Sequence, residues 1–255
     1  MKKLLIPLIS VSFLSGCIVH VGGGHDDSPR EHFSKHLTLS IDDIERLDID
    51  AGAGELNVVG VEGLRTIEVD AQIWAYSRQG DDYSLSLESH GDEAQLIGKN
   101  RSSRGFNFNS GRSPRIDMTV RVPKSLMLFI DDGSGDIVIS NIQGKVSIDD
   151  GSGSINIDNL GDDLSIEDNS GSIRINGVQG KVDIDDNSGN IIITNVKGKV
   201  YIEDGSGDIE VSDVSNSVKI DDGSGDIEVS RVDSLKIIES GSGDVIVHDV
   251  GSYSK

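Results

Sequence analysis

The 255-residue sequence has little of several features that would place it in a common functional class. It has one cysteine, so no disulfide can form within the chain. Aromatic residues make up only 4% of it. Its 23 Lys and Arg stand against 44 Asp and Glu, and the net charge of −21 argues against a nucleic-acid partner, because phosphate backbones are bound by clustered positive charge. After residue 16 no segment approaches the 18 apolar residues that a membrane-spanning helix requires.

The N-terminal residues have the features of an export signal. Two lysines precede an apolar run at residues 4–14, and Leu14-Ser15-Gly16-Cys17 closes this run. The pattern resembles a bacterial lipoprotein signal peptide that ends in a lipobox. This resemblance implies that residues 1–16 are removed, that Cys17 is lipidated and that the chain is anchored in a membrane. Ile18 after the cysteine resembles the pattern that is sorted to the outer membrane of Gram-negative bacteria. An ordinary secretory signal is the alternative.

Residues 17–36 are expected to form a flexible tether. They include Gly22-Gly23-Gly24 and show no apolar period. Most of the histidines lie in this segment and, with the neighbouring aspartates, could hold a transition metal, but their irregular spacing favours a solvated linker. These histidines are His20, His25, His32 and His36.

From residue 133 onward an 18-residue unit recurs seven times without insertion or deletion. Its first turn position accepts only Gly or Asn, which most readily adopt a positive φ, and the position two residues later is always Gly. The first turn position holds Gly133, Gly151, Asn169, Asn187, Gly205, Gly223 and Gly241. A unit this short cannot bury its own apolar side chains, so its copies must stack on one another.

Each unit contains two pairs of apolar residues spaced by two, and one single aliphatic residue. In one unit these are Val146 and Ile148 before the turn, Ile155 and Ile157 after it, and Leu160. A spacing of two indicates a strand with one face buried. The sequence therefore predicts an all-β fold: a single parallel β-helix (β-solenoid), expected to be right-handed, with 18-residue coils that pair with their equivalents one coil away.

The repeat also suggests how the chain is organised. Regular coils are expected over residues 127–255, and Lys236, in the first apolar position of the last coil, predicts a C-terminal cap there. Residues 37–126 are predicted to form irregular N-terminal coils of the same β-helix, because residues 47–63 are a disguised copy of the repeat with Val61 in its fifth apolar position. A separate β-sandwich over residues 37–125 is the alternative.

Two acidic positions precede each turn. The outer position holds Asp131, Asp149, Glu167, Asp185, Glu203 and Asp221. The inner position holds Asp132, Asp150, Asp168, Asp186, Asp204 and Asp222. Stacked like charges favour counter-ions, so the outer carboxylates are candidates for weak binding of a cation such as Ca²⁺, and no other cofactor is expected at them. The phrase Gly-Ser-Gly-Asp-Ile resembles part of the calcium-binding repeat of RTX toxins, but it has an 18-residue period in place of their nine-residue one. The simpler interpretation is that the inner Asp caps its own turn and the outer carboxylates are solvated.

One loop, at residues 98–114, interrupts the acidic composition. Its basic side chains could bind an anionic partner such as a phosphate, a lipid or an acidic polymer, or could fold back onto the acidic surface. The candidate residues are Lys99, Arg101, Arg104, Arg112 and Arg115.

The repeat shows no sign of an active site. Polysaccharide-active enzymes use parallel β-helices and paired carboxylates, but their catalytic groups lie in one groove, whereas these aspartates recur in every coil. Val122-Pro123-Lys124, followed by the Asp-Asp-Gly-Ser-Gly-Asp-Ile phrase and its repeats, resembles a bacterial β-strand-repeat family named for adhesins. This resemblance implies a non-enzymatic β-helix of the cell envelope, which interacts with an unknown envelope protein or polysaccharide, and transfers no functional residue. An enzyme acting on polysaccharides and a calcium-binding repeat protein are the alternatives.

Overall fold

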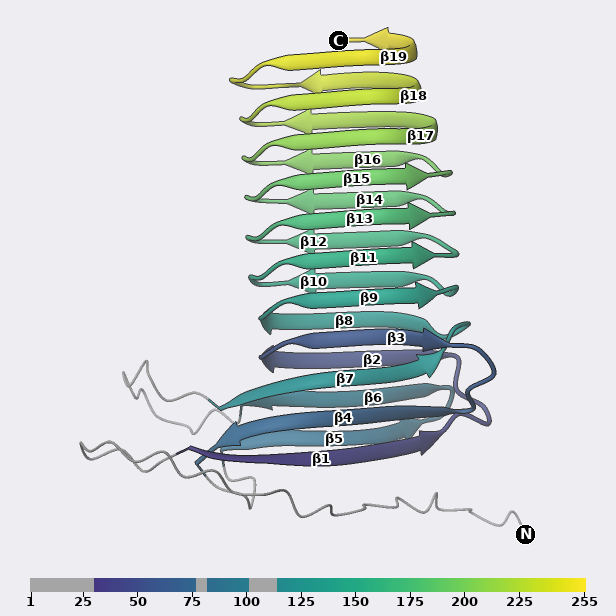
Figure 1. Ribbon diagram of the computed structural model, residues 1–255, viewed down its shortest axis with the longest axis vertical. Helices are drawn as coiled ribbons and strands as arrows, with labels where there is room; N and C mark the ends of the chain where they lie inside the picture. Colours follow the sequence, from purple (N-terminus) through teal and green to yellow (C-terminus); the bar gives the residue numbers. More distant parts are fainter. Residues whose placement is uncertain (1–29, 77–81, 101–113) are drawn as a thin grey trace, which may run out of the picture.

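The computed structural model describes residues 30–76, 82–100 and 114–255. These residues form one tall stack of strands in two facing rows (Figure 1). All the regular elements among them are strands, so this part of the chain offers no helix that could cross a membrane. The predicted all-β solenoid is confirmed.

The regular coils run from β8 to β19. Their strands are β8 (Met127–Ser134), β9 (Ile137–Ile142), β10 (Val146–Asp150), β11 (Ile155–Leu160), β12 (Leu164–Asp168), β13 (Ile173–Val178), β14 (Val182–Asp186), β15 (Ile191–Val196), β16 (Val200–Asp204), β17 (Ile209–Asp222), β18 (Ile227–Glu239) and β19 (Val245–Ser254). From β8 to β16 each strand pairs in parallel with the equivalent strand one coil away. Val146, for example, lies between Leu128 and Leu164. The predicted 18-residue coil is therefore confirmed.

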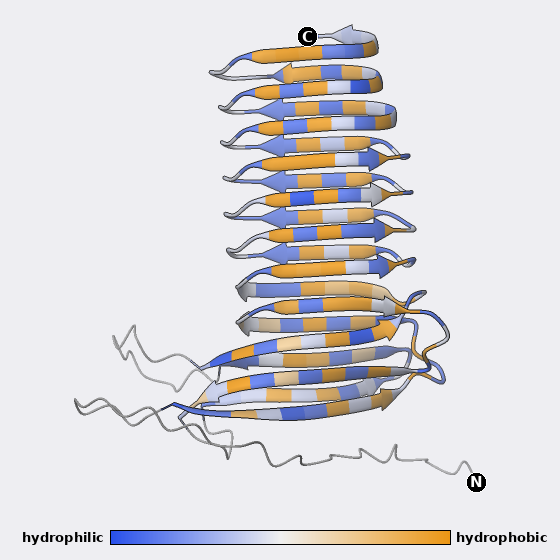
Figure 2. Ribbon diagram, viewed as in Figure 1, coloured by the Kyte–Doolittle hydropathy of each residue, from blue (hydrophilic) through white to orange (hydrophobic). Residues whose placement is uncertain are grey.

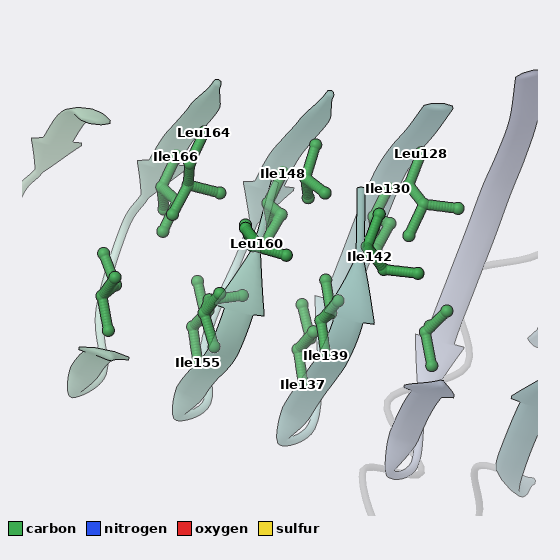
Figure 3. Close-up of a cluster of buried hydrophobic side chains, with 14 of the residues drawn as sticks. Leu128, Ile130, Ile137, Ile139, Ile142, Ile148, Ile155, Leu160, Leu164 and Ile166 are labelled. Carbon is green, nitrogen blue, oxygen red and sulfur yellow. The ribbon is translucent and has the colours of Figure 1, made fainter. Parts of the chain in front are cut away.

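The core lies between the two rows of strands. The five apolar positions of the repeat are buried in the coils before β19, with Val146, Ile155 and Leu160 showing no exposed surface. Apolar and polar residues alternate along many of the strands, whereas β9 and β15 each begin with three consecutive aliphatic residues (Figure 2). Figure 3 shows Leu128 and Ile130 of one row and Ile137 and Ile139 of the other filling the space between them.

One residue in each regular coil has a left-handed backbone conformation. It explains why the fifth apolar residue follows the fourth by three positions and not by two. Asn141, Asn159 and Asn195 have φ of 59–60°, and Gly177 occupies the same position with φ of 78°. This residue turns the chain at the corner, so that the next side chain, such as Leu160 after Asn159, points inward. Asn and Gly are the residues that adopt this conformation at least cost.

The turn glycines are required by the close approach of successive coils. Gly153 has φ of 143°, and a Cβ added there would lie 1.7 Å from the carbonyl oxygen of Gly135 in the preceding coil. The equivalent glycines in other coils show the same approach. The invariant second glycine of the repeat is therefore a condition for stacking.

The N-terminal strands join the same stack but depart from the repeat. They are β1 (Glu31–Ser40), β2 (Arg46–Ala53), β3 (Leu56–Val61), β4 (Thr66–Ala75), β5 (Tyr83–His90), β6 (Glu93–Asn100) and β7 (Arg115–Pro123). β2 and β3 form a true parallel coil, which lies between β6 and β7 on one side and β8 and β9 on the other (Figure 1). β4 pairs antiparallel with both β1 and β7, and β5 pairs antiparallel with β6.

Three expectations for this part of the chain need correction. Residues 67–73 and 83–87 do not form further parallel coils. The first segment lies in β4, which is antiparallel to β1 and β7, and the second lies in β5, which is antiparallel to β6. The tether expected over residues 17–36 does not extend past residue 30, because β1 begins at Glu31 and packs Leu37 and Leu39 into the core. A separate β-sandwich is not formed, because these strands extend the two rows and share one apolar cluster with the coils.

Val61 does not enter the core. β3 alternates without interruption, so Leu56, Val58 and Gly60 face inward while Val61 is half-buried. Positive φ is found at the corner of the regular coils but at no residue of β3, so the chain does not make the corner that would turn Val61 inward.

Lys236 does not mark a cap. A register shift at the corner between β17 and β18 pairs Leu235 with Val218 and Ile237 with Ile220, and a second irregularity after Ile237 restores the repeat. Leu235 and Ile237 are buried and Lys236 points to solvent. A further strand, β19, then pairs in parallel with β18.

Candidate functional site

The outer acidic residues lie in one column on the outward side of β8, β10, β12, β14, β16 and the end of β17. Parallel pairing places each beside its equivalent, as in Asp149 between Asp131 and Glu167. All are exposed except Asp221, which is half-buried. We call this column the acidic face. It comprises Asp131, Asp149, Glu167, Asp185, Glu203 and Asp221.

The acidic face lacks neutralising partners within the described residues. None of its carboxylates forms an ion pair there, and Glu203 alone receives a side-chain hydrogen bond, from the Tyr201 hydroxyl at 3.1 Å. Two unit charges one coil apart, about 4.8 Å, repel by about 0.9 kcal/mol in bulk water. Nowhere in residues 30–76, 82–100 and 114–255 do three or more metal-binding side chains converge. Weak calcium binding therefore stays a prediction to which the structure assigns no ligand set, and the column is described below as a charged surface.

The inner aspartates point into the solenoid. In β10, Val146, Ile148 and Asp150 face the same way, so the alternation that buries the aliphatic residues also buries the carboxyl group. The predicted cap is confirmed in five coils: the Asp150 Oδ1 accepts a hydrogen bond from the Ser152 N–H at 3.1 Å, and equivalent bonds occur at Asp168, Asp186, Asp204 and Asp222. We call the six residues the inner carboxyl column. It comprises Asp132, Asp150, Asp168, Asp186, Asp204 and Asp222.

Burial changes the acidity of this column. Loss of hydration, followed by repulsion from the neighbouring Asp150, raises the pKa of Asp132 to about 7. Burial and the charge of Asp186 raise the pKa of Asp204 to about 7 as well. Burial is also the main cause that raises the pKa of Asp150 and of Asp186 to about 6. The pKa values of the remaining members, Asp168 and Asp222, are raised for the same reason.

The basic loop is only partly described. Arg101, Arg104 and Arg112 lie outside the described residues. Lys99 forms an ion pair with Asp50 on β2. Arg115 donates two hydrogen bonds, of 2.7 and 2.9 Å, to the carboxylate of Asp117. The two candidates that can be placed thus each contact an acidic group of the protein itself.

A row of rings and charges crosses the outward side of β1, β4 and β7. His32 and Trp74 stack with their ring centroids 4.5 Å apart, and the Arg115 guanidinium lies 5.5 Å from the Trp74 ring on the neighbouring strand. Trp74 thus has a packing partner on each neighbouring strand. In the same sheet the His36 Nδ1 lies 2.7 Å from Asp70, whose carboxylate also accepts a hydrogen bond from Arg121.

Sequence reasoning missed this row because it depends on antiparallel pairing between segments far apart in the chain. The alternation of Phe33, Leu37 and Leu39 was the available signal for β1. With β1 assigned, His32 and His36 share its opposite face. The remaining candidate, Cys17, lies outside the described residues.

The strands opposite the acidic face present a different surface. The outward side chains of β9, β11, β13 and β15 include a ladder of short polar groups: the Asn176 Nδ2 donates to Asp158 at 2.7 Å, and the Thr194 hydroxyl donates to Asn176 at 3.1 Å. Asn156 and Ile192 flank the outward-facing Arg174 in the same sheet, and Val138 lies beyond Asn156. The solenoid therefore has one acidic side and one mixed, largely uncharged side.

Comparison with known proteins agrees with this architecture. A structure named "Putative lipid binding protein", from Parabacteroides distasonis, has a TM-score of 0.55 and 19% identity, covering 87% of this chain and 97% of its own. A "putative cell adhesion protein" from Clostridium sporogenes has 11% identity and a TM-score of 0.33, covering 88% and 100% of the two chains. These likenesses concern the fold alone. No curated protein matches the chain by sequence. The pattern of the family described as Toastrack DUF4097 matches residues 44–253. Because this match spans most of the sequence, the chain belongs to the Toastrack DUF4097 family.

Proposed function

We propose that the protein is a non-enzymatic lipoprotein of the outer membrane of a Gram-negative bacterium, anchored through Cys17, and that its solenoid is an interaction or adhesion module. The lipobox-like sequence at residues 14–17 supports both the lipid anchor and the location at a membrane. The repetition of the same side chains in successive coils supports an extended binding surface, because catalysis requires one assembled constellation of groups.

The observation that carries the proposed module is the acidic face. Six carboxylates follow one line along six successive coils, on a frame held by parallel pairing and a buried core. A rigid surface of this kind loses little conformational entropy when it binds. A partner that presents several amino or guanidinium groups in a line could contact several coils at once.

The proposed partner is an envelope protein or polysaccharide with such cationic groups. Attraction between opposite charges on exposed surfaces raises the rate of association and is screened by salt over about 8 Å at physiological ionic strength. Binding is therefore expected to weaken steeply as salt is raised, and to scale with the number of carboxylates available.

A matched pair of variants tests this proposal. The first, Asp149→Asn, Glu167→Gln and Asp185→Asn, removes three charges from the acidic face. The control, Glu210→Gln, Glu228→Gln and Asp233→Asn, removes three exposed charges from elsewhere on the solenoid.

Each protein is immobilised, and fractionated envelope proteins and polysaccharides are applied at low and high salt. At least one fraction is expected to bind the wild type and the control but not the first variant. Equal loss in both variants would show that net charge alone is responsible. Undiminished binding to the first variant would refute a role for the acidic face.

A further inference from the structure

The inner carboxyl column is an unusual feature of this core. Its aspartates lie side by side on successive strands, each paired in register with the next. Their exposed fractions are between 0% and 4%. Ala51 pairs with Asp132 at one end, and Ser240, also buried, takes the equivalent position in the coil after Asp222. Six carboxyl groups are thus enclosed in one line.

Half of the hydrogen-bonding capacity of this column is unused. In the five capped coils the Oδ1 accepts the serine N–H, while the Oδ2 is buried and has no partner. In Asp132 both carboxyl oxygens are buried and have no hydrogen-bond partner. A buried acceptor without a donor is costly, and a buried carboxylate is more so. The unpaired Oδ2 atoms recur once per coil, so a ligand that satisfies them must also be present once per coil.

The charged groups that face the column are all acidic. Along the line they are the other members of the column, and on the same strands the preceding residues of the acidic face. At the far end the Asp208 carboxylate adds to the repulsion at Asp222. Toward the turn lie uncharged Gly, Asn and Ser residues, and within the core lie aliphatic side chains. The preceding residues that add repulsion are Asp131, Asp149, Asp185 and Asp221.

We infer that the inner carboxyl column binds protons, each shared between an Oδ2 atom and a carboxyl oxygen of the aspartate one coil away, and that these protons make the stability of the solenoid depend on pH. A proton supplies the donor that each Oδ2 lacks. It also removes the repulsion between neighbours and needs no cavity. The inference does not depend on the proposed function.

The direction of the dependence follows from the raised pKa values. An aspartate in the unfolded chain ionises near its ordinary pKa of 3.8, whereas Asp132, Asp150, Asp186 and Asp204 ionise near pH 6 to 7 in the folded protein. Their contribution to stability is complete below the ordinary pKa. It falls as the pH rises from about 4, and is lost once the pH has passed about 7. Folding near pH 5 should take up about four protons at these residues.

The test is to measure unfolding of the full chain by urea between pH 4.5 and 8.5. Wild-type stability should fall across this range, with a slope that reports the protons taken up on folding. The variant Asp150→Asn, Asp186→Asn and Asp204→Asn keeps the acceptor for the serine N–H and should take up about three fewer protons. The control Glu210→Gln, Glu228→Gln and Asp233→Asn removes three exposed charges that do not neighbour the column and should keep the wild-type slope.

A second measurement covers the case in which the triple Asn variant does not fold. The carboxyl carbons of wild-type aspartates are followed by NMR as the pH is raised, and at least four should titrate between pH 5.5 and 7.5. Titration of every carboxyl group near pH 4, or equal slopes in the wild type and a folded Asn variant, would overturn the inference. So would a stability that depends on metal ions in place of pH, since the Oδ2 atoms would then be metal ligands.

Discussion

The second turn glycine offers a sharp test of how the coils stack. At Gly189 φ is 151°, and an added Cβ would lie 1.4 Å from the carbonyl oxygen of Gly171 in the preceding coil. The variant Gly189→Ala must therefore adopt a backbone conformation available almost only to glycine, at a cost of about 1–3 kcal/mol. It must also separate two paired coils, and overpacking of this kind costs about 1–3 kcal/mol more. The total is about 2–6 kcal/mol.

Gly177 provides a matched control. Its φ of 78° is close to that of Asn159 and Asn195, which occupy the same position one coil away on either side, and its added Cβ would lie 3.6 Å from the nearest atom. Gly177→Asn should therefore change the free energy of unfolding by less than about 1 kcal/mol. The small backbone strain in the folded state is offset because Asn also reduces the conformational entropy of the unfolded chain.

Thermal unfolding followed by circular dichroism compares the two variants with the wild type. Gly189→Ala should lower the melting temperature by roughly 4–24 °C, from the usual relation between stability and melting temperature in chains of this size. A wild-type midpoint for Gly189→Ala, or an equal loss in Gly177→Asn, would refute the argument that close approach of the coils dictates the glycine.

Two further predictions concern the anchor and the repeat. Cys17→Ser should leave an unprocessed or soluble protein that no longer incorporates radiolabelled palmitate, and labelling that persists would remove the basis for a lipoprotein. Deletion of residues 177–194 removes one whole coil and should leave a folded, shorter solenoid, whereas deletion of residues 177–185 places a turn where a strand belongs and should abolish cooperative unfolding. Circular dichroism and thermal unfolding distinguish these outcomes, and equal behaviour of both deletions would contradict the 18-residue period.

The regular coils could be predicted from the sequence because each one repeats the same local information. Val146, Ile148, Ile155, Ile157 and Leu160 recur at fixed positions, and a parallel register of one whole repeat is the arrangement that superimposes them. The N-terminal strands could not be placed in this way. Thr66–Ala75 pairs antiparallel with two strands distant in sequence, and no repeat marks those partners.

The candidate site was predicted in part. The sequence indicated that the inner aspartates cap their turns, which the structure confirms for Asp150 and its equivalents. It also contained the signal for their burial, because Asp150 follows Ile148 by two residues and so shares its inward direction. Composition drew attention to Lys99 and Arg115 as cations that could bind an anionic partner or fold back onto the acidic surface, but their particular pairing with Asp50 and Asp117 is not something that composition reveals.

The position of β2 and β3 has a consequence for biosynthesis. These strands come early in the chain, yet both sides of their coil are covered by strands made later: Leu47 pairs with Ala94 and Leu128, and Val58 pairs with Val120 and Ile139. A chain that emerges from a ribosome or a translocation channel N-terminus first cannot complete this coil until residue 140 has appeared. The later coils need only their sequence neighbours and can be added one at a time. The segment that forms β2 and β3 is therefore made before the strands that pair with both of its edges.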